Sequence, residues 1–379
     1  MWRASSREVV TLSNSSISHT LCRSLTCSAS SRIVPHPPDL LNWVRKEGGF
    51  VHHSLKIAHI PSYGLGLLAS HEIPQGSDLI VLPPHIPLKF DVFNHGSSYS
   101  PILTDLALHI PEELWTMRLG LKLLQERARS GSFWWPYINN LPDTYSVPIF
   151  FQRKDILNLQ YSPLINQINK RCRFLFDFEK QVKEILANVK PENHPFGGQD
   201  INASSLGWAM SAVSSRAFRL HGDKHSDGVY DSVPTMLPLI DMCNHSFYPN
   251  AKISQLQSLE DAKMLVKVVA EKHINRDVPL EINYGNMSND LFLLDYGFVI
   301  SSNPYDTIEL KYDPHLLDAA SAAVGVDSPY IESPALWQLE ILSALQLAGE
   351  SPSLKVYTSS FDCLSYNFVI IARMLHQYV

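Results

Sequence analysis

The chain has 379 residues, of which 45% are hydrophobic, so it is long enough to bury a large core and to form two packed units. Its formal net charge of -6 and the absence of a long Lys/Arg run argue against direct binding of nucleic acid. No apolar stretch reaches the roughly 20 residues that a membrane-spanning helix needs, and the five cysteines include no Cys-x-x-Cys pair. We therefore expect a globular protein that binds neither nucleic acid nor membrane, in a reducing compartment.

The N-terminal residues differ in composition from the rest of the chain. Ten of the first 32 residues are serine, four are arginine, and Glu8 is their single acidic residue. This composition is typical of an organelle transit peptide, so we expect residues 1–34 to direct the protein to the chloroplast stroma. A disordered tail without a targeting role is the alternative reading, with the mitochondrion or the cytosol as alternative locations.

Short β-like runs separated by turn residues predict a β-rich start up to about Phe90. From about residue 101, apolar residues recur at helical spacing, and Pro111 stands at a helix entrance. The predicted strands of this half cover residues 57–60, 66–69 and 79–82. A second helix is expected over residues 155–190, and a third from Asn202 or Ser204 toward Leu220.

The second half of the chain returns to β-like patterns before a helical end. Strands are expected over residues 236–240, 251–254, 264–270 and 280–284. We therefore predict a β-rich domain over residues 35–302, interrupted by a helical insert over about 101–220. Residues 303–379 are predicted to form a helical domain that looks incomplete.

One glycine motif suggests a nucleotide site. The run from Gly64 to Ala69 fits the G-x-G-x-x-A pattern of dinucleotide-binding proteins, and Asp91 follows at about the expected distance. That site needs a buried strand before the motif and a helix after it, whereas Pro74 and Gly76 end the following segment too early for a helix. Two glycines in a hairpin explain the motif better, and a helix over residues 67–80 would be required to revive the nucleotide reading.

Polar residues gather after two apolar runs. Residues 241–246 follow the run 236–240, and residues 281–285 contain Tyr284 after another apolar stretch. A metal site is disfavoured, because Cys243 and His245 lack two further ligands at ordinary spacing. Taken alone, the first cluster could be a polar turn that caps its own backbone, and Tyr284 could be a half-buried core aromatic.

Six short segments of the chain, taken in order, resemble the SET-domain proteins of the Rubisco large-subunit methyltransferase type. The resemblance implies an α+β fold, in which a β-rich SET domain with a pseudoknot is split by a helical insert. An all-helical C-terminal substrate-binding domain would follow, and it looks truncated here. The resemblance rests on Gly64-Leu65-Gly66, Phe133-Trp134-Trp135-Pro136-Tyr137, Ser215-Arg216-Ala217-Phe218, Asp241 to Ser246, Tyr284-Gly285 and Tyr296-Gly297-Phe298.

The same resemblance implies transfer of a methyl group from S-adenosyl-L-methionine to a lysine of a non-histone protein. Tyr284 matches the catalytic tyrosine, and Arg219 and Asp241 are candidate substrate-binding residues. No metal is implied, and we expect a monomer whose partner is a protein substrate, with a plastid enzyme as one candidate. The residues that the resemblance places at the cofactor are Tyr63, Gly64, Leu65, Gly66, Arg216, Asn244, His245, Tyr284 and Tyr296.

Some features of the sequence depart from the family pattern. Leu68 stands where some relatives carry arginine, and Arg219 is one residue out of step with a substrate-contacting arginine of the plant enzymes. Gly285 after the tyrosine, in place of an aspartate, leaves open a relative that methylates histidine. A SET fold that has lost activity and binds other proteins is a further alternative, and a nicotinamide oxidoreductase rests on the glycine motif alone.

Overall fold

The structure of the protein is a computed structural model, and it describes residues 39–61, 64–90, 100–224, 230–257, 264–311 and 353–357. The chain divides into two compact units. The first runs to Gly285 and includes Leu294–Gly297, and the second comprises Asn286–Leu293 and the chain from Phe298. The predicted leader and most of the predicted C-terminal domain lie outside the described residues, so those domain boundaries stay predictions.

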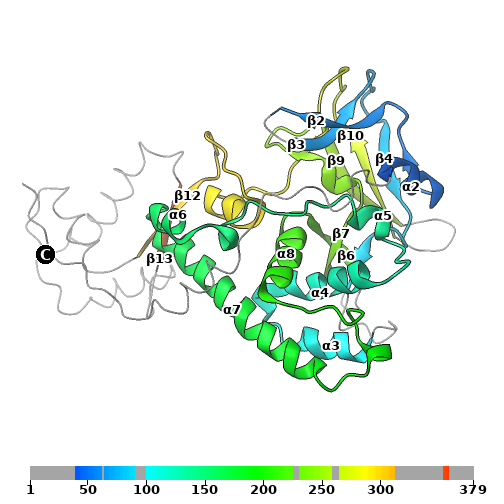
Figure 1. Cartoon of the computed structure of the whole chain (residues 1–379). Helices are drawn as coiled ribbons and strands as arrows, with labels where there is room; N and C mark the ends of the chain where they lie inside the picture. Colours follow the sequence, from blue (N-terminus) through cyan, green and yellow to red (C-terminus); the bar gives the residue numbers. More distant parts are fainter. Residues whose placement is uncertain are drawn as a thin grey trace, which may run out of the picture. The chain divides into compact units, whose positions relative to one another are not determined.

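The β-rich part of the first unit consists of several small sheets (Figure 1). A four-stranded antiparallel sheet has the order β1 (Phe50–Val51), β4 (Asp78–Leu82), β10 (Met264–Ala270) and β9 (Ala251–Gln257). Val266, Val268 and Ala270 alternate on its buried face, as a half-buried strand requires. The other antiparallel pairs are the β2 (Leu55–Ile60) and β3 (Gly64–Ala69) hairpin and the sheet of β5 (Leu88–Lys89), β7 (Tyr230–Met236) and β6 (Ala217–Lys224).

One pair of strands in the first unit is parallel. β8 (Asn244–His245) pairs with β11 (Glu281–Ile282), and their register places Glu281 opposite Asn244 and Ile282 opposite His245. Two polar segments that are far apart in the sequence therefore lie side by side. This is the arrangement that the expected pseudoknot requires.

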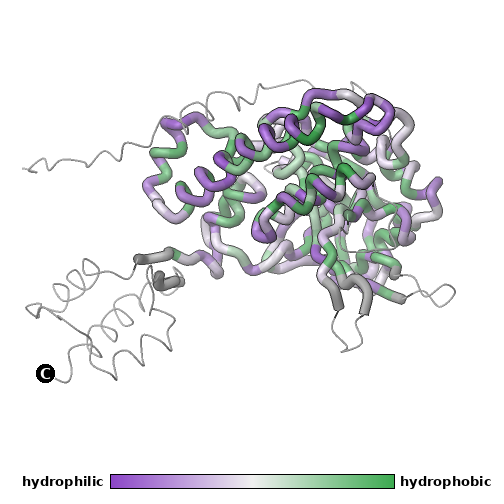
Figure 2. Tube along the Cα trace, turned by 90° about the horizontal axis from the view of Figure 1, so that it is seen from below, coloured by the Kyte–Doolittle hydropathy of each residue, from purple (hydrophilic) through white to green (hydrophobic). Residues whose placement is uncertain are grey.

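The helical insert lies between the two groups of strands in the sequence and packs through apolar faces. The longest helix, α7, buries residues at three- and four-residue steps: Leu164, Ile168, Cys172, Leu175, Phe178 and Val182. Hydrophilic and hydrophobic residues alternate along the tubes of the helices in Figure 2. The insert helices are α3 (Pro101–Leu108), α4 (Trp115–Ala128), α5 (Trp135–Ile138), α6 (Arg153–Asn158), α7 (Ser162–Leu186) and α8 (Ala203–Ser214), with short 3-10 turns at Glu112–Leu114, Pro148–Phe150 and Pro191–Asn193.

The structure corrects two helix predictions. Residues 155–190 form two helices instead of one, because Gln160 has a left-handed φ of 50° and Pro163 starts α7. The helix that begins after Asn202 ends at Ser214 and does not continue to Leu220. The residues that follow extend as β6 because β7 pairs with them.

The structure also corrects the β-rich regions. α2 (Leu40–Lys46) was not expected, although Asp39 caps it by accepting a hydrogen bond from the backbone of Asn42 at 3.1 Å. The strand predicted over residues 236–240 is wrong, since β7 ends at Met236 and a 3-10 turn covers Ile240–Met242.

The nicotinamide reading required a helix over residues 67–80. The structure has the end of β3 and the start of β4 there, so this alternative is wrong. None of the described helices is long and apolar enough to cross a membrane.

The second unit contains the short helix α9 (Asn289–Leu291) and an antiparallel pair, β12 (Thr307–Lys311) with β13 (Ser353–Tyr357). The pair is an addition to the all-helical domain expected from the sequence. Asn289 organises the start of this unit, because its amide binds the backbone of Ile300 and the carboxylate of Asp306.

Candidate functional site

The parallel pair β8–β11 brings the two predicted polar segments together. The backbone of Asn244 donates to the Leu280 carbonyl at 3.0 Å, and Ser246 donates to the Ile282 carbonyl at 3.0 Å. Beyond the pair, the backbone N–H of Tyr284 donates to Nδ1 of His245 at 3.1 Å. Asn244, His245 and Tyr284, which lie some 40 residues apart in the sequence, thus form one cluster.

His245 is a neutral, buried member of this cluster. Burial lowers its pKa to about 4, so the imidazole carries no charge near neutral pH. Because Nδ1 accepts the Tyr284 N–H, the ring hydrogen of the neutral form lies on Nε2. The His245 ring lies 5.2 Å from the ring of Tyr284, centroid to centroid, and packs edge-on against Phe247 at 4.7 Å.

Tyr284 holds its hydroxyl proton firmly. The hydroxyl donates to the backbone carbonyl of Cys243 at 2.5 Å, and burial raises the pKa of Tyr284 well above its ordinary value. The ring stacks on Tyr296 at 5.1 Å with an angle of 19° between the rings. Burial raises the pKa of Tyr296 as well, so both aromatic walls stay uncharged at neutral pH.

The helical insert fixes the turn that carries Tyr296. This residue ends a π-helical turn, Phe292–Tyr296. Arg171 of α7 pairs with the Asp295 carboxylate at 2.7 Å, and the Ser214 hydroxyl donates to the Asp295 carbonyl at 3.2 Å. Gly297 has a φ of +79°, and a Cβ there would overlap the carbonyl of Ser146, so glycine is required at this position.

The predicted glycine segment lies beside Asn244. A Cβ on Gly66 would lie 2.6 Å from Nδ2 of Asn244 and 2.7 Å from Cδ1 of Ile60, so the missing side chain leaves room for the amide. Gly64 has a φ of +81° at the start of β3, and Leu65 is 44% exposed. Tyr63, which was also predicted to bind the cofactor, lies outside the described residues.

Arg216 and Asp241 form an ion pair, in which Asp241 lies three residues before Asn244 in the sequence. Nη1 of Arg216 donates to Oδ2 of Asp241 at 3.1 Å and to its carbonyl at 3.3 Å. The Asp241 side chain is fully buried, and its turn begins with Leu239 at a strained φ of 72°. Burial acts to lower the pKa of Arg216, but the Asp241 carboxylate, with the nearby Tyr145 and Tyr137, raises that pKa on balance.

Arg219 and Asp241, the two predicted substrate-binding residues, lie in different surroundings. Arg219 is exposed, and its guanidinium lies 4.7 Å from the centre of the Trp115 ring. Asp241 is enclosed with Arg216. Their substrate roles stay predictions, and the geometry associates Asp241 with Arg216, which was predicted to bind the cofactor.

Sequence reasoning missed two buried tyrosines of the insert. The Tyr137 hydroxyl donates to Oδ2 of Asp241 at 2.7 Å. Burial raises the pKa of Tyr145 to about 12, although the nearby Arg216 guanidinium acts in the opposite direction. The aromatic run from Phe133 to Tyr137 was the available signal, but the sequence does not show which of its side chains points toward Asp241.

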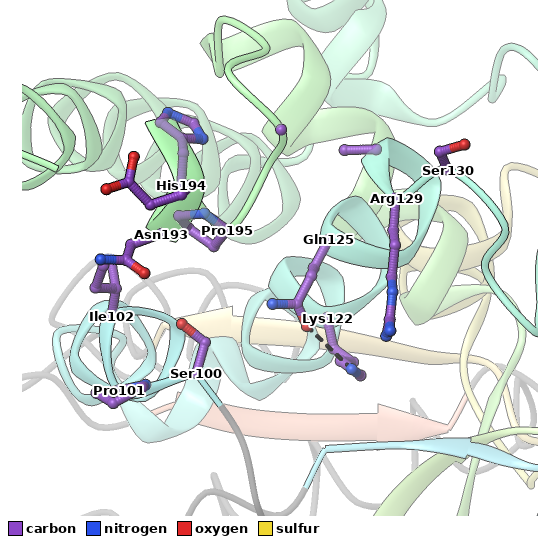
Figure 3. Close-up of a pocket in the computed structure, with 13 residues that line it drawn as sticks. Ser100, Pro101, Ile102, Lys122, Gln125, Arg129, Ser130, Asn193, His194 and Pro195 are labelled. Carbon is purple, nitrogen blue, oxygen red and sulfur yellow. Dashed lines mark hydrogen bonds between the residues drawn. The ribbon is translucent and has the colours of Figure 1, made fainter. Parts of the chain in front are cut away.

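A groove of about 900 Å³ in the helical insert is separate from these residues (Figure 3). It lies between α3, the end of α4 and the segment around His194, and none of the predicted site residues lines it. Lys122 on its wall is paired with the buried carboxylate of Glu126 at 2.7 Å and so brings little net charge. Within the described ranges, no group of three or more His, Cys, Asp or Glu side chains could hold a metal ion.

The proteins of known function and the solved structures that are similar to this chain are methyltransferases. No family model matches the chain. The chain is 29% identical over 279 residues to the actin-histidine N-methyltransferase of Xenopus tropicalis and 27% identical to that of Homo sapiens, over 72% of this chain in each case. These alignments cover 45% and 44% of the relatives, so the chain spans less than half of their length.

Solved structures share the fold at lower sequence identity. The SET domain of LSMT bound to lysine and AdoHcy matches with a TM-score of 0.61 at 17% identity, over 89% of this chain and 72% of that one. Rubisco LSMT bound to AdoMet matches with a TM-score of 0.55 at 16% identity, over 87% and 69%. The chain therefore has the SET-domain fold that the order of its motifs predicted.

Proposed function

We propose that this protein is an S-adenosylmethionine-dependent methyltransferase that modifies a side-chain nitrogen of another protein, with lysine as the first candidate acceptor. The observation that carries the proposal is the cluster of Asn244, His245 and Tyr284 on a SET fold, together with the ion pair that Arg216 forms with Asp241. The relatives named for protein methylation support the same class of reaction.

The buried polar atoms of the site fit the methionine end of this cofactor. Arg216 Nε, Asp241 Oδ1 and Asn244 Nδ2 are buried and have no hydrogen-bond partner in the described part of the chain. Such atoms are costly to bury unless a ligand satisfies them. A carboxylate suits the N–H groups of Arg216 and Asn244, and an ammonium suits Asp241. We propose that these three residues, with His245, Tyr296 and Gly64 to Gly66, hold the cofactor.

The aromatic residues determine what the site does with the acceptor nitrogen. S-adenosylmethionine, when bound, supplies a methyl group attached to a positively charged sulfur. Tyr284 does not act as a general base, because its pKa is raised and its hydroxyl donates a hydrogen bond to the backbone carbonyl of Cys243. Its oxygen can still accept a hydrogen bond and so orient the acceptor nitrogen. Burial of the acceptor between Tyr284 and Tyr296, beside the positively charged sulfur, would disfavour an ammonium group and so promote loss of the lysine proton.

Histidine is the second candidate acceptor. The sequence relatives are named as actin-histidine N-methyltransferases, whereas one structure of the same fold contains lysine. A neutral histidine already presents an unprotonated nitrogen at pH 7, so it would not need to lose a proton on entering the site. A plastid protein substrate, a monomeric state and location in the chloroplast stroma remain proposals that follow from the sequence alone.

Two linked measurements test the function. Calorimetric titration of the full chain with S-adenosylmethionine, with its demethylated product and with NADH should give micromolar binding of the first two and none of NADH. Incubation with labelled methyl donor and cell extract, followed by acid hydrolysis and chromatography, then identifies methyl-lysine or methyl-histidine. A folded sample that binds neither sulfur compound would leave a SET-fold protein-binding module as the better account.

A further inference from the structure

Tyr137 connects the helical insert to the predicted cofactor site. It lies on α5 and is 1% exposed, and its hydroxyl donates to Oδ2 of Asp241 at 2.7 Å across 104 positions of sequence. The same oxygen accepts the Arg216 guanidinium at 3.1 Å. One carboxylate oxygen therefore receives two donors, one from α5 and one from Arg216, which follows α8.

The short helix that carries Tyr137 is anchored on both sides. Trp134 precedes it, and its indole N–H donates to the Ile86 carbonyl at 2.9 Å. Asn140 follows it, and its side-chain amide donates back to the Pro136 carbonyl at 2.8 Å. The tyrosine hydroxyl is thus delivered by a fixed stretch of backbone, as the positioning of a second group requires.

Asp241 and Arg216 keep part of their hydrogen-bonding capacity unused. Oδ1 of Asp241 and Nε of Arg216 are buried and have no hydrogen-bond partner among the residues that the structure describes. Both interactions that orient the carboxylate fall on Oδ2. The other oxygen and the remaining guanidinium edge are therefore held in fixed directions, available to a ligand.

We propose that Tyr137 is a positioning residue of the cofactor site, which orients the Asp241 carboxylate and through it the Arg216 guanidinium. This inference rests on the proposed function, because it concerns the residues that would hold the methionine end of S-adenosylmethionine. It gives the helical insert a role in cofactor affinity. Tyr137 itself contacts Asp241 and acts on the cofactor through it.

The hydroxyl also acts on the charge of Asp241. Complete burial raises the pKa of Asp241, and the Arg216 guanidinium and the Tyr137 hydroxyl both act to lower it. Removal of the hydroxyl therefore raises the pKa of Asp241 further, so the carboxylate gains its proton at a higher pH. The titratable groups that face Asp241 are Arg216, Tyr137, Tyr145, Cys243 and Tyr284.

None of those neighbouring groups changes charge between pH 5.5 and 8. Burial raises the pKa of Tyr145 and of Cys243 to about 12, and it raises the pKa of Tyr137 and Tyr284 as well. Arg216 stays protonated, since Asp241 raises its pKa. Among the protein groups that face the ligand, Asp241 is therefore the one whose protonation weakens binding as the pH falls, because it removes an attraction for an ammonium. The amino group of the cofactor, with an ordinary pKa of about 8, titrates in this range too, so Tyr137→Phe is compared with the wild type at each pH.

The experiment measures the Kd of S-adenosylmethionine by calorimetry at pH 6 and pH 8 in the full chain and in Tyr137→Phe. Loss of a hydrogen bond to a charged group should weaken binding about 10-fold at pH 8, and by more at pH 6. Tyr248→Phe, which removes the hydroxyl of a tyrosine that is 81% exposed, is the matched control and should bind as the wild type does.

A second substitution covers the case in which Tyr137→Phe does not fold. Incorporation of 3-fluorotyrosine at position 137 keeps the shape and makes the phenol a stronger donor, so the pH at which affinity falls should move down. A folded Tyr137→Phe protein with wild-type affinity at both pH values would overturn the positioning role, even if its melting temperature were lower. Failure of the wild type to bind would instead remove the proposed function.

Discussion

At the scale of single residues, the chemistry of the site depends on where each proton is held. The Tyr284 hydroxyl donates a hydrogen bond to a backbone carbonyl. His245 accepts a hydrogen bond from a backbone N–H and stays neutral. Neither group is prepared to take a proton from a substrate. In the proposed reaction, the site would therefore orient a nitrogen that has already lost its proton and would contribute no strong base.

The first prediction concerns Tyr284→Phe. Removal of the hydroxyl should lower turnover at least about 100-fold, because the acceptor nitrogen loses the oxygen that orients it. The Kd of S-adenosylmethionine should change less than about threefold, since the ring still stacks on Tyr296. Initial rates with labelled methyl donor and calorimetry measure the two quantities, and Tyr248→Phe is the control. Equal losses of turnover and of affinity would contradict the role assigned to Tyr284.

The polar residues of the site were predictable from the sequence, but their partners were not. Arg216, Asn244 and Tyr284 each follow or begin a regular element, and motif order identified them. The ion pair of Arg216 with Asp241 and the hydroxyl of Tyr137 depend on how the insert packs, which local sequence does not encode. The Tyr284 hydroxyl donates its hydrogen bond to a backbone carbonyl. Every residue carries such a carbonyl, so the sequence does not show which one accepts.

At the scale of elements, α8 (Ala203–Ser214) places Arg216 directly before the start of β6. Asn202 caps this helix, and with Ser205 it forms a reciprocal pair of side-chain to backbone hydrogen bonds at 3.0 Å each. The far end of α8 also supplies Ser214, whose hydroxyl binds the turn of Tyr296. A helix cap on one side of the unit therefore supports two site residues at the other end of the helix.

The second prediction is that Asn202→Ala lowers the free energy of unfolding by about 1 kcal/mol. The backbone N–H of Ser205 loses its acceptor, so the first turn of α8 is weakened. Thermal melting followed by circular dichroism should show the decrease, while the Kd of S-adenosylmethionine in the folded protein stays unchanged. The control Asn158→Ala, at an exposed position on α6, should melt within about 0.5 kcal/mol of the wild type. An unchanged melting curve for Asn202→Ala would show that the cap adds no stability.

Elements with a clear periodic pattern were predicted well. Residues 264–270 match β10, and of the two caps expected from the sequence, Asn202 and Ser204, the structure has Asn202. The misses have physical causes. The helix after Asn202 was extended too far because Phe218 to Leu220 can join either a helix or a strand, and pairing with β7 decides for the strand.

At the scale of the whole molecule, the groups around the acceptor nitrogen keep a constant charge near and above neutral pH. Burial lowers the pKa of His245 to about 4 and raises the pKa of Cys243 to about 12, and it raises the pKa of Tyr284 and Tyr296 as well. Burial thus removes these four side chains as sources of pH dependence between pH 7 and 9. At saturating S-adenosylmethionine, where cofactor affinity does not limit the rate, the pH dependence that remains belongs to the substrate nitrogen.

The third prediction uses this constancy to distinguish the two acceptors. For lysine, whose free pKa is about 10.4, kcat/KM for the protein substrate should rise about tenfold per pH unit from pH 7 to 9, because the neutral amine becomes more abundant. For histidine, whose free pKa is about 6.5, it should be nearly flat above pH 7.5. Initial rates at saturating S-adenosylmethionine, with the substrate found by labelling, decide between them. A rate that falls between pH 7 and 9 would fit neither acceptor, and it would mean that a group of the protein titrates where burial should prevent it.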